Sequence, residues 1–468
     1  MTDTKVLYEQ FLKLEEDLNL FDERIAGVLF WERVRFDFFL KIVKFDAGIP
    51  FAARKRVSSK FRYYLSSIIS FMRNPFLVRR KKILFAGTPR RLLRNDGCWW
   101  DIYTDPIINL LKTSTVSIEY SFLFNHFKPP RTKNLRYFDF LDFLSHSMQV
   151  LRLTRLDFTQ RENQLLTTLQ EELKTRFGVE IDVLQRVKLV LEKRKARLPL
   201  YQILLRRIQP SFVVVVTSYG KEDFIEACKS LKIPVAELQH GVIHRFHLGY
   251  SYEGRNRNKV TYPDYLLSFG EYWKEGIEYP IPSERIIPVG FPLIDDQRTK
   301  FASIQRKNQI VFISQTTAGE LLSKFAVELS KTKQLPFKIV YKLQPQECDI
   351  WKENYPWLID SDVEVIDTKS DVLHKILAES KMQIGVSSTA LYEGLAFGLR
   401  TFITDGPGVE YLDALVNSGI VQKIETSDDL LRLFEEEERI GSFDSEYFFK
   451  SGATRAIADF LEERIMKS

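Results

Sequence analysis

The sequence predicts an α/β protein with two Rossmann-like, doubly wound domains that face each other across a cleft, preceded by a helical N-terminal extension. Three observations lead to this fold class. Short apolar runs alternate with helix-length segments from residue 212 onward, which is the pattern of a parallel sheet. The alternation stops between residues 290 and 308 and then resumes, which indicates a second domain. Residues 1–78 show no regular strand pattern and favour helices.

These breaks divide the chain into four expected parts. A helical, basic extension covers 1–78, and the two Rossmann-like domains cover 79–300 and 301–440. The last part, 441–468, is expected to be a helix that packs back on the first domain. A chain of 468 residues with 44% hydrophobic residues is long enough to bury a core in each domain.

In the first domain, strands are expected where short apolar runs end at a glycine, a proline or a polar residue. They cover residues 82–87, 116–124, 212–217, 234–239, 264–269 and 285–289. The run 212–217 (FVVVVT) is apolar almost throughout, as expected of a strand buried on both faces. Apolar residues at three- and four-residue spacing predict helices within 150–208, and a further helix is expected at 221–231.

The second domain shows the same alternation more regularly. Strands are expected at 309–313, 337–342, 363–366, 382–386 and 400–404. Helices are expected between them, at 319–331, 370–380, 388–397 and 409–418. Alternation at this spacing over roughly 130 residues predicts a doubly wound unit.

Composition narrows the setting in which the protein works. Cys98, Cys228 and Cys348 lie more than a hundred residues apart, so they form neither a metal-binding pair nor a disulfide framework. The first 19 residues are polar and acidic and do not resemble a secretory signal. The sequence also lacks an uncharged apolar run of about 18 residues, the length a spanning helix needs. We therefore expect a cytoplasmic protein.

A basic block follows the N-terminal extension. Residues 51–100 hold 13 Lys and Arg against one acidic residue, Asp96. Within this block, 61–78 is rich in aromatic and aliphatic residues and is flanked by basic clusters, which suits a helix lying on an anionic membrane surface. The alternative is a helix packed on the next domain with its basic ends solvated. We expect residues 51–94 to attach the protein to the cytoplasmic face of a membrane. No nucleic-acid partner is expected, because no nucleic-acid motif accompanies the charge.

In an open parallel sheet, ligands bind beyond the carboxyl ends of the strands. The residues expected at these ends are small, hydroxyl-bearing or polar, which suits an anionic ligand. In the first domain they include Gly87, Thr88, Ser218–Gly220 and Gln239–Gly241. In the second domain they include Gln315, Thr316, Lys342, Gln344 and Ser387–Thr389.

The sharpest local pattern is residues 385–398 (GVSSTALYEGLAFG), where a strand gives way to a helix near Ser388. Free N–H groups at the start of that helix can hold a diphosphate, with Ser387, Ser388 and Thr389 adding hydroxyl donors. Glu393 lies one turn after Thr389, and its carboxylate could accept hydrogen bonds from ribose hydroxyls. The alternative is an ordinary serine-capped helix with a solvated glutamate.

The second pattern is Gln239-His240-Gly241 at the end of an expected strand. With an ordinary pKa near 6.5, a histidine there can accept a proton from an attacking hydroxyl. The alternative is a structural histidine bonded to the backbone. His244 and His247 follow at spacings of four and three, which could suggest zinc, but Gly241 and the expected loop break the helical face such a site uses. No metal site is expected.

Taken together, these segments resemble the two-domain GT-B glycosyltransferases of surface polysaccharide assembly, in particular capsule polysaccharide synthesis proteins and teichoic-acid glycerophosphotransferases. The matching pieces are Gln239–Gly241, Val289–Pro292, Val340–Pro345 and Gly385–Gly398. They fall within about residues 210–425, and the first 200 residues carry little resemblance. The order and spacing of the pieces carry the resemblance more than any single one.

The resemblance implies a role for each matching residue. His240 would be the general base on the acceptor side, where Gly87, Thr88 and Gly241 also lie. The residues implied to bind the donor are Lys342, Gln344, Ser387, Ser388, Thr389 and Glu393, beside Gln315 and Thr316. One departure matters: such proteins often have His where this chain has Gln344, and an amide can neither carry positive charge nor shuttle a proton.

The sequence therefore predicts a metal-independent transferase without a cofactor. It would move a sugar, or a polyol phosphate, from a nucleotide-activated donor to a glycan or lipid-linked acceptor. Two alternatives stay open. One is a nucleotide-sugar epimerase of the same fold. The other is an inactive transferase-like subunit that binds a glycan or nucleotide, for which Gln344 and the basic block leave room. Fold alone cannot choose among them.

Overall fold

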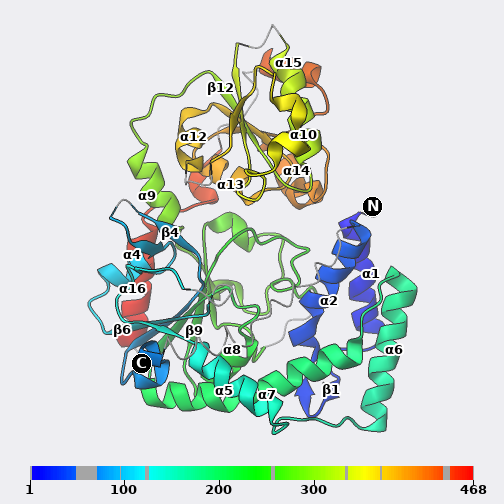
Figure 1. The fold of residues 1–468 in the computed structure, drawn as a ribbon, viewed down its shortest axis with the longest axis vertical. Helices are drawn as coiled ribbons and strands as arrows, with labels where there is room; N and C mark the ends of the chain where they lie inside the picture. The colour runs from blue at the N-terminus through cyan, green and yellow to red at the C-terminus, as the bar shows by residue number, and fades with distance from the viewer. Residues whose placement is uncertain are drawn as a thin grey trace. The chain divides into compact units, whose positions relative to one another are not determined.

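The computed structural model describes residues 3–48, 71–94, 96–121, 126–254, 259–332, 336–368, 372–435 and 443–466. The chain forms two compact units (Figure 1). The first unit contains Met1–Ser268, Gly276–Ile287 and Thr454–Ser468. The second unit contains Phe269–Glu275 and Pro288–Ala453, so it begins before the boundary expected at residue 301.

The first unit is built on a seven-stranded sheet in the order β11-β10-β9-β8-β3-β6-β7. The strands are β3 (Ile83–Gly87), β6 (Thr115–Glu119), β7 (Leu135–Tyr137), β8 (Phe212–Val216), β9 (Val235–Leu238), β10 (Tyr265–Ser268) and β11 (Ile286–Pro288). Every neighbouring pair from β7 to β10 is parallel. Numbered along the chain, the first six strands follow the order 3-2-1-4-5-6 of doubly wound nucleotide-binding folds. The first Rossmann-like domain is thereby confirmed.

The strands form where the sequence is apolar enough to be buried on both faces. All five residues of β3 and of β8 are buried, which explains why FVVVV shows no polar alternation. Helices α5 (Asp139–Val150), α7 (Val183–Ile208) and α8 (Glu222–Ser230) contribute side chains to the same core. The sequence pattern did not predict β7 or α5. It also did not predict the short hairpin of β4 (Arg91–Leu93) and β5 (Trp99–Asp101). Helix α4 (Asp105–Leu110) lies between this hairpin and β6 in the chain.

The helices expected within 150–208 are present as α6 (Gln160–Phe177) and α7. Helix α6 starts with a capping box between Thr159 and Glu162 and ends at Gly178 in the left-handed conformation. Helix α7 starts at the N-cap Asp182, whose side chain accepts from the backbone N–H of Gln185. These local signals explain why both helices could be located from sequence.

The N-terminal residues are an integral part of the first unit. They form α1 (Thr4–Asp17), the hairpin β1 (Arg24–Ile25) with β2 (Val28–Leu29), and α2 (Trp31–Asp46). Aromatic side chains of α1 and α2 share one hydrophobic core with apolar side chains of α6 and α7. Residues 3–48 are thus helical as expected, but they pack into the first unit and do not extend from it.

Part of the basic block falls outside the described residues, namely 51–70. Of the helix expected over 61–78, the described part forms two 3-10 turns, η1 (Phe71–Arg73) and η2 (Pro75–Leu77). Asn74 between them and Pro75 interrupt an α-helix at this point, because proline cannot donate a backbone hydrogen bond. Among the helices that the structure describes, each is too short or too polar to cross a membrane.

The second unit is built on a six-stranded parallel sheet in the order β14-β13-β12-β15-β16-β17. Its strands are β12 (Gln309–Ile313), β13 (Lys338–Lys342), β14 (Glu364–Ile366), β15 (Met382–Gly385), β16 (Arg400–Ile403) and β17 (Val421–Lys423). This is again the order 3-2-1-4-5-6, so the second Rossmann-like domain is confirmed. Strand β17 was not predicted, because it is only three residues long.

Helices flank the second sheet on both sides (Figure 1). They are α9 (Pro292–Lys300), α10 (Gly319–Ser330), α11 (Trp351–Asn354), α12 (Leu373–Glu379), α13 (Thr389–Ala396), α14 (Asp413–Asn417) and α15 (Ser427–Glu435). The helix expected at 409–418 is a 3-10 turn, η6 (Val409–Leu412), that leads into α14. The break expected at 290–308 contains α9.

The last helix, α16 (Ala453–Met466), belongs to the first unit except for Ala453. Its Phe460 packs edge-on against Phe212 of β8 and Tyr265 of β10, at centroid distances of 6.0 and 5.4 Å. The chain therefore returns to the first sheet after completing the second.

Candidate functional site

In the second unit, β12 and β15 are neighbours, but the chain leaves them in opposite directions along the sheet. Such a switch point opens a crevice at the carboxyl edge. Gln315 follows β12 and Ser387 follows β15, and the two side chains meet there. The Gln315 amide donates to the Ser387 hydroxyl at 3.1 Å, and the Ser387 backbone N–H donates to the Gln315 Oε1 at 3.2 Å. The structure thus brings together two expected donor-binding residues that are 72 positions apart.

A third loop joins this contact. The Ser387 hydroxyl lies 3.1 Å from the carbonyl oxygen of Pro407, in the segment after β16. Gln344, in the loop after β13, accepts a hydrogen bond of 2.8 Å from the Thr316 hydroxyl. The residues expected at three different strand ends therefore form one polar cluster, which we call the switch-point cluster: Gln315, Thr316, Gln344 and Ser387.

Helix α13 begins beside this cluster. Ser388 is its N-cap and accepts from the backbone N–H of Ala390 at 3.3 Å, while Thr389 is exposed at the first helical position. Gly394 and Gly398 of this segment are explained by packing and by backbone conformation. A side chain at Gly394 would collide with buried Gln383, and Gly398 adopts φ +70°, which suits the helix end. The pattern at 385–398 thus combines packing constraints with a free helix N-terminus.

Lys342 and Glu393 are held by protein partners. The buried Lys342 ammonium donates to the carbonyl oxygens of Leu343 at 2.7 Å and Thr368 at 3.3 Å. Glu393 forms a hydrogen bond of 3.0 Å with Nε2 of His374, which is buried on α12. Both side chains thereby connect loops and helices at the sheet edge.

A pocket of about 830 Å³ opens at the same edge. Its walls come from the loop after β12, the loop after β16 and one face of α10. The lining residues include Thr316, Thr317, Gly319, Lys324, Thr404, Asp405 and Pro407. Pro407 and Thr316 both belong to the pocket and contact the switch-point cluster.

In the first unit, His240 lies directly beyond β9 and both of its ring nitrogens face tyrosine hydroxyls. Nε2 lies 2.8 Å from the Tyr219 hydroxyl, and Nδ1 lies 3.4 Å from the Tyr250 hydroxyl. The Tyr103 hydroxyl donates to the His240 backbone oxygen at 2.7 Å. Burial, with smaller contributions from His247, Arg90 and Lys221, lowers the pKa of His240 to about 3. The imidazole is therefore neutral at physiological pH. Its pKa lies far below the ordinary value near 6.5 that was assumed from the sequence.

The surroundings of His240 contain further perturbed groups. Glu237 of β9 is fully buried, and the Tyr250 hydroxyl donates to its carboxylate. Burial raises the pKa of Glu237 to about 7, so a proton stays on this carboxyl over part of the physiological range. Burial also lowers the pKa of Lys221 to about 8. Lys221 donates to the backbone oxygens of Val216 and Thr217 at the end of β8.

The sequence pattern placed Tyr219 at a strand end but indicated no role for it. Tyr250 and Lys221 were not predicted as site residues. Perturbed pKa values in a buried cluster at a sheet edge are typical of functional sites. The available signal was the density of Tyr and His between residues 240 and 252.

The other acceptor-side residues are less central. A Cβ at Gly87 would lie 3.2 Å from the carboxylate Oδ2 of Asp101, so this glycine permits close packing of the β5 end. Thr88 is half-buried beside it. The Gly241 carbonyl accepts from the Gln239 side chain at 2.8 Å. Asp96, the one acidic residue of the basic block, is exposed and paired with Arg131.

Within the part of the chain that the structure describes, no three His, Cys, Asp or Glu side chains are grouped so as to hold a metal ion. His247 stacks on Phe36 at a centroid distance of 4.6 Å, and burial lowers the pKa of His244 to about 3. These two histidines take part in packing around His240.

Two doubly wound domains, each with polar side chains gathered at the carboxyl edge of its sheet, define a two-domain Rossmann-like protein. No protein-family model matches the chain. A comparison with curated proteins gives no match either.

Solved structures with a similar fold include a UDP-GlcNAc 2-epimerase from Neisseria meningitidis bound to UDP-GlcNAc, at 15% identity, covering 82% of this chain and 100% of the other, with a TM-score of 0.46. MurG from Acinetobacter baumannii is similar at 11% identity, covering 82% and 99%, with a TM-score of 0.45. The wall teichoic acid polymerase TagF is similar at 11% identity, covering 87% and 98%, with a TM-score of 0.41.

Proposed function

We propose that this protein is a glycosyltransferase that uses a nucleotide-activated sugar in surface or capsular polysaccharide synthesis. The observation that carries the proposal is the switch-point cluster of the second unit, where Gln315 and Ser387 meet beside the N-terminus of α13. Hydroxyl, amide and free backbone N–H groups at a switch point are suited to the phosphates of a nucleotide. The donor is thereby assigned to the second unit.

The chemistry on the acceptor side is assigned to His240. A neutral imidazole at the carboxyl edge of the first sheet can take the proton of an acceptor hydroxyl as that hydroxyl attacks the anomeric carbon. The bond from that carbon to the donor phosphate breaks, and the electron pair leaves with the nucleotide. Partial positive charge at the start of α13 stabilises the charge that develops on the phosphate.

No metal or cofactor is part of this proposal, because the helix N-terminus supplies stabilisation that a cation would otherwise give. A glycan or lipid-linked glycan is the proposed acceptor. Action on such an acceptor at the cytoplasmic face of a membrane agrees with the basic residues of 51–94, which are proposed to hold the protein at anionic lipid. The similar structures include an epimerase and a polymerase, so they favour neither reaction.

The proposal is tested by thermal shift with a panel of nucleotides and nucleotide sugars, followed by product analysis with and without glycan acceptors. A ligand at a hundred times its Kd stabilises the native state by about 2.7 kcal/mol, which a melting curve detects. Ser387→Ala and Gln315→Ala should lose most of the shift. Ser330→Ala, at the far end of α10, is the matched control and should keep it.

Three outcomes would contradict the proposal. Absence of any nucleotide-dependent shift would remove the donor site. Equal shifts in Ser387→Ala and the wild type would place that site elsewhere. Conversion of the nucleotide sugar without an acceptor would identify an epimerase instead.

A further inference from the structure

A second pocket, of about 470 Å³, lies wholly within the first unit. Its walls are α2, α7, the start of α8 and the residues 248–252 and 261–262. We propose that this pocket binds a neutral saccharide, the terminal sugar of the acceptor, and that Tyr219 relays the acceptor proton to His240. The inference rests on the proposed transferase function for the reaction, but the saccharide site itself can be tested without activity.

One wall of the pocket is aromatic. Phe36, Tyr219, Tyr252 and Tyr262 all line it, together with the aliphatic Leu248. The rings of Phe36 and Tyr219 lie 5.1 Å apart between centroids, so they form a continuous surface. A pyranose ring has apolar C–H faces that pack on such a surface and a polar rim of hydroxyls. Aromatic side chains with a few well-placed polar groups are the usual lining of small-molecule sites.

The charged side chains of the pocket balance one another. The lining holds four cations, Arg33, Arg186, Lys193 and Arg197, and four anions, Glu32, Asp37, Glu222 and Asp223. The net charge of the lining is therefore zero. An anionic ligand such as a phosphate gains no net attraction there, whereas a neutral ligand is not penalised.

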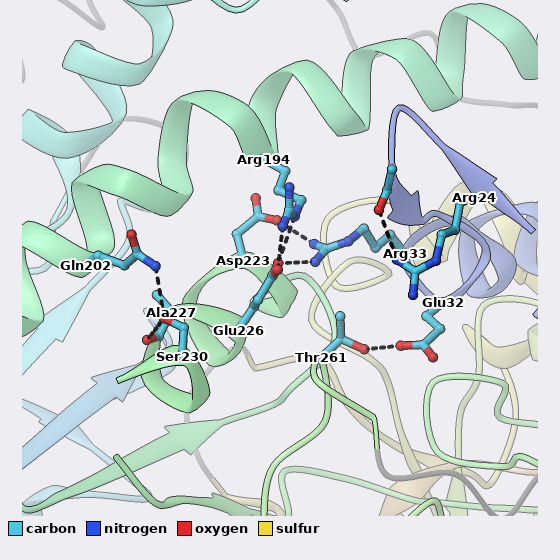
Figure 2. A network of polar contacts seen from close by, with 11 residues as sticks. Arg24, Glu32, Arg33, Arg194, Gln202, Asp223, Glu226, Ala227, Ser230 and Thr261 are labelled. Carbon is cyan, nitrogen blue, oxygen red and sulfur yellow. Dashed lines mark hydrogen bonds and ion pairs between the residues drawn. The ribbon is translucent and has the colours of Figure 1, made fainter. Parts of the chain in front are cut away.

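The arginines of the lining are also already engaged in ion pairs. Arg33 pairs with Asp223 at 2.6 Å and with Glu226, which in turn pairs with Arg194 (Figure 2). Arg186 lies 3.0 Å from Asp37, and Arg197 lies 2.8 Å from Asp142. Planar carboxylates and guanidinium groups in such a network keep spare lone pairs and N–H groups, which hydrogen-bond vicinal hydroxyls.

The polar rim contains further hydroxyl-compatible groups. Glu32 accepts a hydrogen bond of 2.8 Å from Thr261, and both line the pocket (Figure 2). Tyr262 also lines the pocket, but its hydroxyl is buried and has no hydrogen-bond partner within the residues that the structure describes.

Tyr219 connects this pocket to the proposed base. It lines the pocket, whereas His240 does not, and its hydroxyl lies 2.8 Å from Nε2 of His240. Because the Tyr250 hydroxyl donates to Glu237, its oxygen is left to accept from Nδ1–H of His240. This network assigns the lone pair of His240 to Nε2, which faces Tyr219.

Glycosyl transfer and proton transfer occur together in the proposed step. The acceptor oxygen attacks the anomeric carbon of the donor sugar, and the carbon–oxygen bond to the donor phosphate breaks with its electron pair leaving on the nucleotide. The acceptor hydroxyl gives its proton to the Tyr219 oxygen, while Tyr219 gives its own proton to Nε2 of His240. Tyr219 is regenerated as the neutral phenol, and His240 leaves the step as imidazolium.

Saccharide binding is tested first, by saturation-transfer NMR on the full chain. The probes are methyl β-glucoside, lactose and N,N′-diacetylchitobiose, compared with glucose 6-phosphate and glucuronate. We expect transfer to at least one neutral sugar and none to the charged ones. Phe36→Ala should abolish it, and Phe45→Ala, an exposed phenylalanine at the other end of α2, should not. Lack of transfer to every neutral sugar, or transfer unaffected by Phe36→Ala, would overturn the site whether or not the protein is a transferase.

The relay is tested by Tyr219→Phe, which keeps the ring and removes the hydroxyl. Saccharide transfer should persist, while kcat should fall by about 10²-fold or more with little change in the acceptor KM. Tyr120→Phe, which removes a hydroxyl bonded to Tyr201 elsewhere in the first unit, is the control. Unchanged kcat in Tyr219→Phe would overturn the relay and leave direct proton transfer to His240. Loss of saccharide transfer in a folded Tyr219→Phe protein would also overturn it, because the hydroxyl would then serve binding.

Discussion

The Tyr219 hydroxyl lies 2.8 Å from Nε2 of His240, and this contact joins the ends of the neighbouring strands β8 and β9. It involves Nε2, the nitrogen of His240 that is proposed to act as the base. It also contributes to the burial that keeps the imidazole neutral.

Replacing His240 with alanine should lower turnover by about 10²- to 10⁴-fold, the usual contribution of a positioned general base. Nucleotide affinity should change little, because the donor is assigned to the second unit. Initial rates and nucleotide titrations measure both quantities. His146→Ala, half-buried on α5, is the control. Near-normal turnover in His240→Ala would move the base to another group such as Glu237, and lost nucleotide affinity would make His240 a binding residue.

Acid should destabilise the native state through three buried histidines. Burial lowers the pKa of His240 to about 3, of His244 to about 3 and of His247 to about 4. Below pH 6.5 the unfolded chain protonates these imidazoles but the native state does not, so stability falls as the pH drops from 6.5 toward 4. Each histidine contributes up to about 1.4 kcal/mol per pH unit in this window.

Glu237 acts in the opposite direction. Its pKa is raised by burial to about 7, so its contribution to stability is lost as the pH rises through 7. Urea unfolding at pH 7 and pH 5 measures the net effect. His244→Gln should reduce the pH dependence, because it removes one of these buried imidazoles. A pH dependence that His244→Gln does not alter would contradict the neutral state of this histidine.

Removing the Glu393 carboxylate should both weaken donor binding and destabilise the second unit. The 3.0 Å hydrogen bond with buried His374 implies a cost of about 1–3 kcal/mol. A double-mutant cycle with His374→Asn isolates the pair. Nucleotide affinity that stays unchanged would end the donor role of Glu393, and unchanged stability would contradict the pair.

The N-terminal core should depend on one buried ion pair. Arg35 is 1% exposed, donates to Glu15 at 2.7 and 3.0 Å and to the carbonyl oxygens of Leu248 and Ser251. Arg35→Met leaves a buried carboxylate unpaired and should cost about 3–5 kcal/mol in the free energy of unfolding. Lys174→Met, which breaks an exposed pair with Glu180, is the control and should cost nothing measurable. Equal effects of the two substitutions would show that the Arg35 pair is not essential.

Residues 51–94 should bind anionic membranes in a salt-sensitive manner, because exposed charges are screened beyond roughly 8 Å at physiological ionic strength. The expected result is flotation with anionic liposomes at low salt, with release at high salt. Neutral liposomes provide the control, and a protein with the Arg and Lys residues of 79–82 changed to Gln should bind less. Equal flotation with both liposome types, or with neither, would argue against membrane attachment by charge.

Much of the fold could be predicted because its signals are local. Runs such as FVVVV in β8 are apolar throughout, and the capping box of α6 and the serine cap of α13 mark helix starts. Short elements were missed for the converse reason. Strands β7 and β17 have three residues each, too few for a pattern to emerge from composition. The integration of α1 and α2 into the first unit depends on contacts with α6 and α7, which no local pattern reveals.

By itself, the sequence determined the two doubly wound units and the strand ends at which polar residues gather. Hydrophobic burial acts residue by residue along a strand, so it leaves a readable pattern. Only the tertiary structure decided which of those residues meet. Gln315 reaches Ser387 because β12 and β15 are neighbours in the sheet, and Lys342 and Glu393 have protein partners that the sequence did not indicate. Tyr219, Tyr250 and Glu237 surround His240, and the burial they share lowers its pKa. Strand order and burial are properties of the assembled sheet, so neither can be read from the residues one at a time.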